Sequence, residues 1–202
     1  MDAGDLKLIG GWMCLDFANT VDWPDGDRRH ESLNSYSDLV SWSRHVGILT
    51  ESEARQLVQE ARKRPKAAKE VLKRAVTLRE AVYRIFSAIA SKISPNALDF
   101  TTLNAELNEA MTRVRIVPAD GGYSWAYATE GNALDRMLWP LARSASDLLT
   151  SDKLDRISKC SAKDCGWLFL DMSRNRSRRW CDMKDCGNRA KARRHYQRKR
   201  AL

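Results

Sequence analysis

The stretch "CSAKDCGWLFLDMSRNRSRRWCDMKDCGNR", residues 160–189, holds four of the chain's five cysteines in two evenly spaced pairs. Four residues separate the cysteines of each pair, and fifteen residues separate the two pairs. Four thiolates at such spacing suit a structural Zn²⁺ site, because this ion accepts four ligands in a tetrahedron. The sequence therefore predicts Zn²⁺ as the cofactor, with these ligands: Cys160, Cys165, Cys181 and Cys186.

The residues between and after the two pairs predict a small finger fold. The segment "GWLFLDMSRNRSRRWC" has the pattern of a strand, a polar turn and a second short strand. After it, "NRAKARRHYQRKRA" contains neither Gly nor Pro, which predicts a helix beginning near Cys186. Knuckle, hairpin and helix would form a treble-clef-like finger, with Trp167, Phe169 and Trp180 as its small core.

Positive charge is concentrated in the same quarter of the chain as the paired cysteines. The chain carries 35 Lys and Arg against 26 Asp and Glu, a formal net charge of +9. Residues 151–202 contain 16 basic and 6 acidic residues, so the first 150 residues are close to neutral. Such asymmetry indicates a polyanionic partner for the basic end.

Residues 1–150 predict a mainly helical domain with one β-hairpin. Apolar residues recur at helical spacing, and Thr50 and Glu53 form a capping-box pattern. Pro140 falls inside the last predicted helix and indicates a kink or break there. The hairpin is predicted around the loop 119–122. The helices are predicted within residues 35–49, 50–64, 66–93, 97–113 and 133–149.

The fold class is thus mainly α, in two parts: a helical domain over residues 1–151 and a zinc finger with a basic C-terminal helix over residues 152–202. No apolar run approaches the length that spans a bilayer, and the first residues lack the pattern of a signal peptide. We therefore expect a cytoplasmic protein with no membrane partner. A reducing cytoplasm favours metal ligation or redox chemistry over disulfides for paired cysteines.

Several motifs together resemble a known family. The pattern C-x4-C, "LFLD" and "RRWC-x4-CGNR" with a basic tail resembles the CGNR zinc finger of bacterial proteins regarded as transcription regulators. "CLDFANTVD" near the start and "LREAVYRIF" in the centre resemble the ABATE domain that precedes this finger. The resemblance covers nearly the whole chain. It implies a finger that binds double-stranded DNA, controlled by a domain that senses a small molecule.

Basic residues of the finger are the candidate DNA contacts. They suit phosphate contacts, with a few side chains left to contact base edges. Those on the predicted last helix surround it, so they cannot all contact one duplex, and the others lie on the predicted turn and second strand. Asn188 either pairs with an adenine edge or forms a local hydrogen bond at the knuckle. The candidates are Arg174, Arg176, Arg178, Arg179, Asn188, Arg189, Lys191, Arg193, Arg194 and Arg198.

Polar residues near the start of the chain suggest a ligand pocket. Oriented polar groups among aromatic side chains are typical of small-molecule sites. Two alternatives remain: the acidic and amide side chains cap helices and hold a turn, and Arg79 pairs with Asp16. The candidate pocket residues are Asp16, Asn19, Thr20, Arg28, Trp42 and Arg79.

Three functions fit these patterns. The first is a ligand-responsive transcription regulator, in which a homodimer would give a specific DNA site from a small finger. The second is an RNA-binding protein, and the third is a redox sensor that loses zinc when its thiolates are oxidised. An enzyme is not expected, because the sequence has no Gly-rich phosphate loop, no His/Glu metal pair and no nucleophile with a recognisable base.

Overall fold

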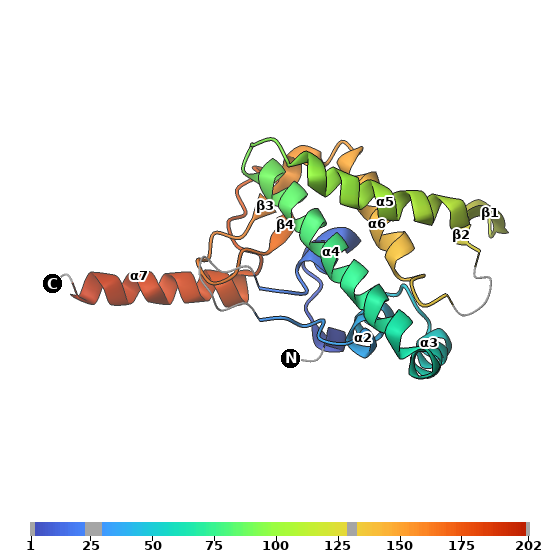
Figure 1. Ribbon diagram of the computed structural model, residues 1–202. Coiled ribbons are helices and arrows are strands. Elements are labelled where there is room, and N and C mark those ends of the chain that lie inside the picture. Colours follow the sequence, from blue (N-terminus) through green and yellow to red (C-terminus); the bar gives the residue numbers. More distant parts are fainter. Residues whose placement is uncertain (1–2, 23–29, 129–132, 201–202) are drawn as a thin grey trace.

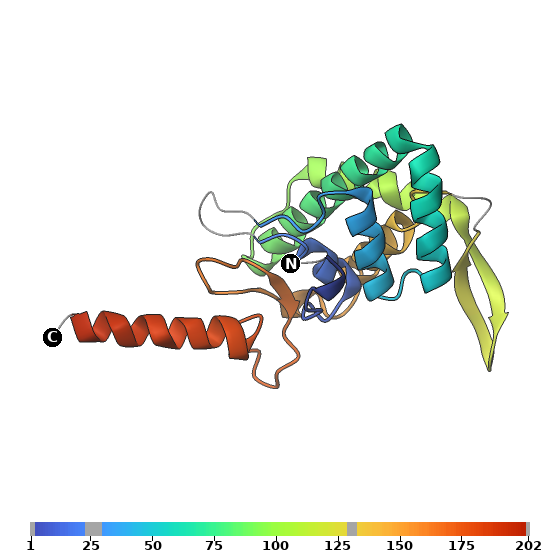
Figure 2. The ribbon, with the colours of Figure 1, turned by 90° about the horizontal axis from the view of Figure 1, so that it is seen from below.

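The structure, a computed structural model, describes residues 3–22, 30–128 and 133–200 (Figures 1 and 2). Helices dominate these residues, and the cysteines gather at the C-terminal end, so the predicted fold class is confirmed. The α-helices are α1 (Met13–Ala18), α2 (Tyr36–His45), α3 (Glu51–Lys63), α4 (Pro65–Ala90), α5 (Ala97–Arg113), α6 (Leu138–Leu149) and α7 (Asn188–Arg200). Short helical turns are η1 (Ala3–Asp5), η2 (Leu154–Arg156) and the π-helical η3 (Met183–Gly187). Two antiparallel sheets pair β1 (Val114–Ala119) with β2 (Gly122–Tyr127) and β3 (Ile157–Lys159) with β4 (Leu168–Leu170).

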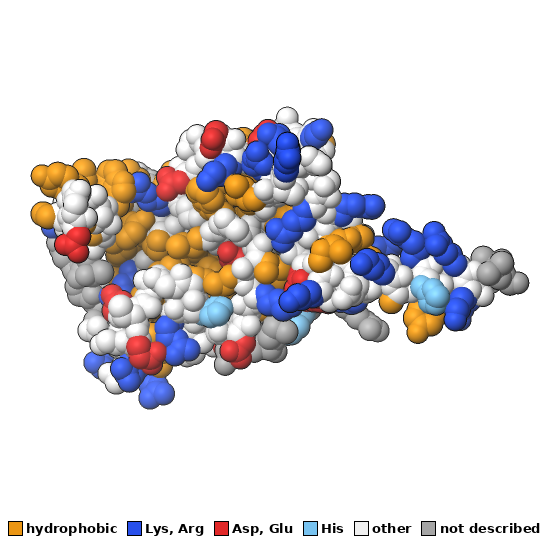
Figure 3. Space-filling view, turned by 180° about the vertical axis from the view of Figure 1, so that it is seen from behind, with side chains coloured by type: hydrophobic (Ala, Val, Ile, Leu, Met, Phe, Trp, Pro, Cys, Tyr) orange, Lys and Arg blue, Asp and Glu red, His pale blue; other side chains and the backbone are white. Residues whose placement is uncertain are grey.

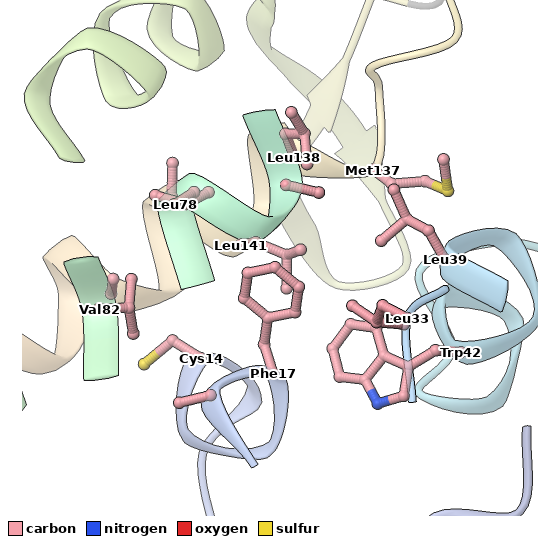
Figure 4. Packing of buried hydrophobic residues seen from close by; sticks show 14 of the residues in the cluster. Cys14, Phe17, Leu33, Leu39, Trp42, Leu78, Val82, Met137, Leu138 and Leu141 are labelled. Atoms are coloured by element: carbon pink, nitrogen blue, oxygen red, sulfur yellow. The ribbon is translucent and has the colours of Figure 1, made fainter. Parts of the chain in front are cut away.

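Helix α4 runs through the middle of the molecule and contacts most other elements, including α1, α2, α3, α5, α6, β3 and β4. Its buried side chains recur every three or four residues, as an amphipathic helix requires. Figure 4 shows Phe17 of α1 between Leu78 of α4, Leu141 of α6 and Trp42 of α2. The core therefore forms where α1 inserts between the longer helices.

Local sequence signals fix most helix ends. Thr50 and Glu53 form the predicted capping box at the start of α3. Pro65 occupies the first position of α4, where a missing N–H costs nothing. This helix ends at Ala90, three residues before the predicted end, because Lys92 takes φ +57° and the N–H of Ile93 turns back to the carbonyl of Ala88.

The last helix of the domain, α6, begins five residues later than predicted and has no break. Pro140 is the third residue of α6, so its ring lies in the first turn, where no intrahelical N–H bond is lost. The predicted kink was therefore wrong because the predicted start was too early. Among the described helices, none combines the length and apolarity needed to cross a membrane.

The predicted hairpin is present as β1 and β2, and it projects from the body (Figure 2). Its register places Ile116 opposite Trp125 on one face. Both side chains are largely exposed, as is Tyr123. Figure 3 shows hydrophobic side chains at this end of the molecule, opposite α7.

The sheet of the finger differs from the predicted one. The partner of β4 is β3, which precedes the first cysteine pair, and residues 178–180 form no strand. Because side chains alternate along a strand, Leu168 and Leu170 join the helical core while Phe169 points into the cysteine cluster. One three-residue strand thus joins the two apolar clusters of the molecule.

Candidate functional site

The four predicted zinc ligands converge on one point. All four Sγ atoms lie within 4.8 Å of one another, and the Sγ of Cys181 is 3.5 Å from those of Cys165 and Cys186. Four sulfurs bound to Zn²⁺ at about 2.3 Å in a tetrahedron are separated by about 3.8 Å, so this cluster fits the ion. The four side chains are buried. Zn²⁺ would link the two knuckles and supply folding free energy that so small a core lacks.

Backbone hydrogen bonds bring the two cysteine pairs together. The N–H of Cys160 donates to the carbonyl of Trp167 at 2.8 Å, which closes the first knuckle beside β3 and β4. The N–H of Ser161 donates to the carbonyl of Arg179 at 2.9 Å. This second bond brings the segment that leads into Cys181 beside the first knuckle.

The glycines of the two "KDCG" sequences serve different purposes. Gly166 has φ +73°, a conformation that favours glycine and turns the chain from Cys165 into β4. Gly187 has no positive φ, but a Cβ atom there would lie 2.8 Å from the Sδ atom of Met183. A larger residue at position 187 would therefore have to displace the exposed side chain of Met183.

The cysteines perturb one another's protonation. Hydrogen bonding to the neighbouring Cys160 thiol raises the pKa of Cys165 and Cys181, and burial raises both further. The same contacts lower the pKa of Cys160. A divalent cation binds the thiolate form of all four residues, so its binding releases protons.

Arg178, a predicted DNA contact, is occupied inside the finger. Its guanidinium carbon lies 4.3 Å from the centre of the Phe169 ring. Its Nε donates to the carbonyl of Trp180 at 3.0 Å, and its Nη2 donates to the carbonyl of Cys181. The contacts of this arginine hold the chain that enters the second knuckle.

Two residues of the "CGNR" sequence also make local contacts. The Nη2 of Arg189 donates to the Sγ of Cys186 at 3.1 Å, and its guanidinium pairs with Asp164 at 3.3 Å and Asp185 at 3.2 Å. Asn188 donates from its amide to the carbonyl of Lys184 at 3.0 Å, as the local alternative predicts. Both side chains therefore bind the finger to itself.

The other basic candidates lie on the outer surface. Arg176 pairs with Asp155, Arg193 lies 3.6 Å from Asp164, and Arg179 stacks near the Trp180 ring. Four more side chains are exposed and make no hydrogen bond or ion pair with the described residues: Arg174, Lys191, Arg194 and Arg198. Figure 3 shows Lys and Arg side chains gathered along α7 and the adjoining surface.

Helix α7 projects away from the body of the molecule (Figures 1 and 2). It has thirteen residues, of which seven are Lys or Arg, none is acidic and none is buried. A helix with no apolar face contributes nothing to the core. Apart from Asn188, Arg189 and Arg193, which contact the finger, its polar side chains are directed to solvent.

Comparison with known families agrees with this geometry. Residues 11–152 match the model of the ABATE family, described as "Putative stress-induced transcription regulator". This chain belongs to the ABATE family. Residues 156–199 match the CGNR zinc finger. Neither description names an enzymatic activity, and no curated protein matches the chain. Below, the ABATE part means residues 11–152 and the CGNR finger means residues 156–199.

The predicted pocket residues of the ABATE part do not line one cavity. Asp16 accepts the N–H of Gly10 at 2.7 Å, as the turn-holding alternative predicts. Trp42 is fully buried beside Phe17, with 5.3 Å between ring centres. Arg28 lies outside the described residues. Of the described candidates, Asn19 lines a cavity of about 250 Å³ between the start of the chain and the finger.

Arg79 is held by Glu31 and does not pair with Asp16. Its two terminal nitrogens donate to the two carboxylate oxygens of Glu31 at 2.6 and 2.7 Å, and one of them also reaches Thr20 at 3.3 Å. Burial raises the pKa of Glu31, but the hydrogen bonds and charge of Arg79 outweigh burial and keep this pKa below its usual value. This bidentate pair fixes the segment beside α4.

Asn19 joins the ABATE part to the CGNR finger. Its amide donates to the carbonyl of Leu168 at 2.8 Å and accepts the N–H of Leu168 at 2.8 Å. The N–H of Leu170 donates to the carbonyl of Gly10 at 2.8 Å. The free edge of β4 is thus paired with the start of the chain. No local sequence signal indicates this contact, because its partners are 149 residues apart.

Proposed function

We propose that this chain is a zinc-dependent transcription regulator that binds double-stranded DNA through α7. The observation that carries the proposal is an exposed helix of thirteen residues, basic around its surface, that begins at the four-cysteine cluster. An α-helix fits the major groove of B-form DNA, and Lys and Arg contact its phosphates. The four cysteines hold Zn²⁺, and the metal fixes the direction in which α7 leaves the body.

One face of α7 is the proposed contact surface. Lys191, Arg194 and Arg198 lie within about 60° of one another around a helix of 3.6 residues per turn. These three side chains make no hydrogen bond or ion pair with the described residues. Asn188 and Arg189 are instead assigned to holding the knuckle. The proposed contacts thus lie farther along the helix than its first turn.

Salt dependence of binding tests this face. In the variant K191A/R194A/R198A, three phosphate contacts are lost, so the slope of log K against log salt should become shallower by about 2.7. The matched control is K66A/K69A/K73A, which removes the same charge from exposed positions on α4. Fluorescence anisotropy of a labelled duplex measures both variants. Equal slopes for the two variants would contradict the assignment of α7 as the DNA contact.

The nature of the nucleic acid is tested by selection. A random pool of duplex DNA, selected on the zinc-loaded chain and sequenced, should yield an enriched motif. A palindromic motif would support a homodimer, because protein and site then share a two-fold axis. Preferential binding of RNA would contradict the proposal, since the deep, narrow major groove of A-form RNA excludes a helix.

We further assign the sensing of a small molecule to the ABATE part. DNA binding places the protein in the cytoplasm, where thiols remain reduced and available to the metal. The effector would act by changing how the finger is held. The edge of β4, bonded to Asn19 and Gly10, is the contact through which such a change would pass.

A further inference from the structure

A small cavity lies at the start of α6, and none of the described candidate pocket residues lines it. Its volume is about 200 Å³. Ile48 and Leu49, from the loop between α2 and α3, form one wall with Pro140. The remaining lining residues are Glu53 of α3, Tyr127 of β2, Arg136 and Trp139. The cavity thus combines apolar walls with a few polar groups, the usual composition of a small-molecule site.

Arg136 is the unusual member of this lining. Its side chain is 9% exposed, yet its Nε and Nη2 atoms are buried and make no hydrogen bond within the described structure. The nearest described carboxylate oxygen, Oε1 of Glu53, lies 3.8 Å from Nη2, beyond hydrogen-bond distance. Two buried guanidinium nitrogens without hydrogen bonds are costly, so they favour an acceptor at this place in the cavity.

A second residue of the lining, Trp139, also has a buried N–H donor without an acceptor in the described part of the chain. Trp139 is 1% exposed, and its Nε1 makes no hydrogen bond to any described residue. Its ring packs against Tyr127, with 5.9 Å between the ring centres. Three buried donor nitrogens therefore come from two residues that line one cavity. Such a set matches an anionic acceptor, and a planar guanidinium suits a carboxylate in particular.

We propose that this cavity binds a small carboxylic acid with an apolar body. The carboxylate accepts from Arg136 and Trp139, and the apolar body packs against Ile48, Leu49 and Pro140. The volume is below the range of about 300–1,000 Å³ typical of sites for drug-sized ligands, so the acid is small. Binding does not depend on DNA. The role of this acid as the effector rests on the proposed function above.

Glu53 decides between two kinds of acid. Its Oε2 accepts from the backbone and hydroxyl of Thr50 at 2.8 Å in the capping box, whereas Oε1 faces Arg136. An α-amino acid would place its ammonium at Oε1. A simple acid has no ammonium group, so its carboxylate would be repelled by the negative charge of Glu53. Glu53→Gln preserves the capping box and removes the charge.

The probes are 4-methylpentanoate, leucine and the neutral amide 4-methylpentanamide. Calorimetric titration of the zinc-loaded chain should show that at least one of the two carboxylates binds at least tenfold more tightly than the amide. Arg136→Met should abolish this preference. The matched control is Arg143→Met, which removes the same charge from α6 at a residue outside the cavity. If leucine binds more tightly than 4-methylpentanoate, Glu53→Gln should weaken leucine binding. If 4-methylpentanoate binds more tightly, the same substitution should strengthen its binding.

A second readout does not depend on replacing Arg136. Trp139→Phe keeps an aromatic side chain of smaller size and removes the N–H, so it should weaken binding of the tighter-binding acid about tenfold. The indole N–H signal that disappears in this variant should be the one that shifts when the acid is added to the wild-type chain. The proposal is overturned if neither acid binds more tightly than the amide, or if Arg136→Met binds as wild type. Since no DNA is present, either result leaves DNA binding by α7 untouched.

Discussion

Asp16 shows at the scale of one residue how burial sets the pH dependence of the fold. Burial raises the pKa of its carboxyl from 3.8 to about 6, and N–H bonds from Gly10 and Ile9 only partly oppose this rise. Between these pH values the folded protein binds a proton more tightly than the unfolded chain does. The free energy of unfolding therefore falls as the pH rises through this window, by up to about 3 kcal/mol.

Asp16→Asn should remove that component of the pH dependence. The amide oxygen still accepts the N–H of Gly10, but it carries no charge at any pH. We expect the variant to match wild type near pH 4 and to exceed its stability above about pH 7 by about 1–3 kcal/mol. Urea unfolding at both pH values measures the difference. Asp120→Asn, at the exposed turn of the hairpin, is the control, and an equal effect there would refute the assignment.

Arg189, a predicted DNA contact, instead contacts a predicted metal ligand. Its bond to the Sγ of Cys186 lies directly beside the metal position, and contacts of this kind orient ligands. Arg189→Gln should lower zinc affinity by about 10- to 100-fold. Competition with a chromogenic chelator measures that affinity. Arg194→Gln removes the same charge from the outer surface of α7, and we expect it to leave zinc affinity unchanged while weakening DNA binding.

At the scale of elements, strand β4 depends on contacts that lie far away in the sequence. Asn19 satisfies both the N–H and the carbonyl of Leu168, which are buried. Asn19→Ala leaves these two groups unpaired, and we expect a loss of about 2–4 kcal/mol in the free energy of unfolding. Asn175→Ala, on the exposed turn of the finger, should change it by less than about 0.5 kcal/mol. A loss for Asn19→Ala no larger than for Asn175→Ala would show that water replaces the side chain.

The elements that the sequence predicted are those with strong local signals. Helix α5 has the predicted bounds, and α3 begins at its capping box, because periodicity and caps act within a few residues. Strand β3 was missed because three residues carry no measurable alternation. The start of α6 was placed too early because Leu134 and Met137 continue the apolar spacing of the helix, whereas residues 134–137 form turns.

The contacts at the candidate sites follow the same rule: those between residues close together in the sequence could be predicted, and those between distant residues could not. Two short cysteine spacings were enough to predict which thiols meet. The pair of Arg79 with Glu31 joins residues 48 apart, and a contact at that distance leaves no periodic trace. Arg136 carries a weaker local signal: with Asp135 it forms the only charged pair in the otherwise apolar stretch from Ala133 to Ala142. Charged side chains in such a stretch indicate either a buried ion pair or a ligand.

At the scale of the whole molecule, the metal site and the helical core share one strand. Leu168 and Leu170 belong to the helical core, while Phe169 belongs to the cysteine cluster. Loss of the metal should therefore unfold the knuckles and α7 and loosen β4 without unfolding the helices. The segment from Gly10 to Asn19 should loosen with β4, because its hydrogen bonds end on that strand.

Amide hydrogen exchange of the Cys181→Ser variant tests whether loss of the metal unfolds the finger and spares the helical core. We expect amides of residues 160–167 and 178–200 to exchange as in an unfolded chain and those of residues 10–20 to lose part of their protection. Helix α5 should keep its protection, since it packs mainly against α4 and α6. Cys14→Ala, which changes a buried cysteine outside the cluster, is the control. Unchanged protection of residues 10–20 would mean that the finger folds independently, and loss of protection in α5 would mean that the chain unfolds as one cooperative unit.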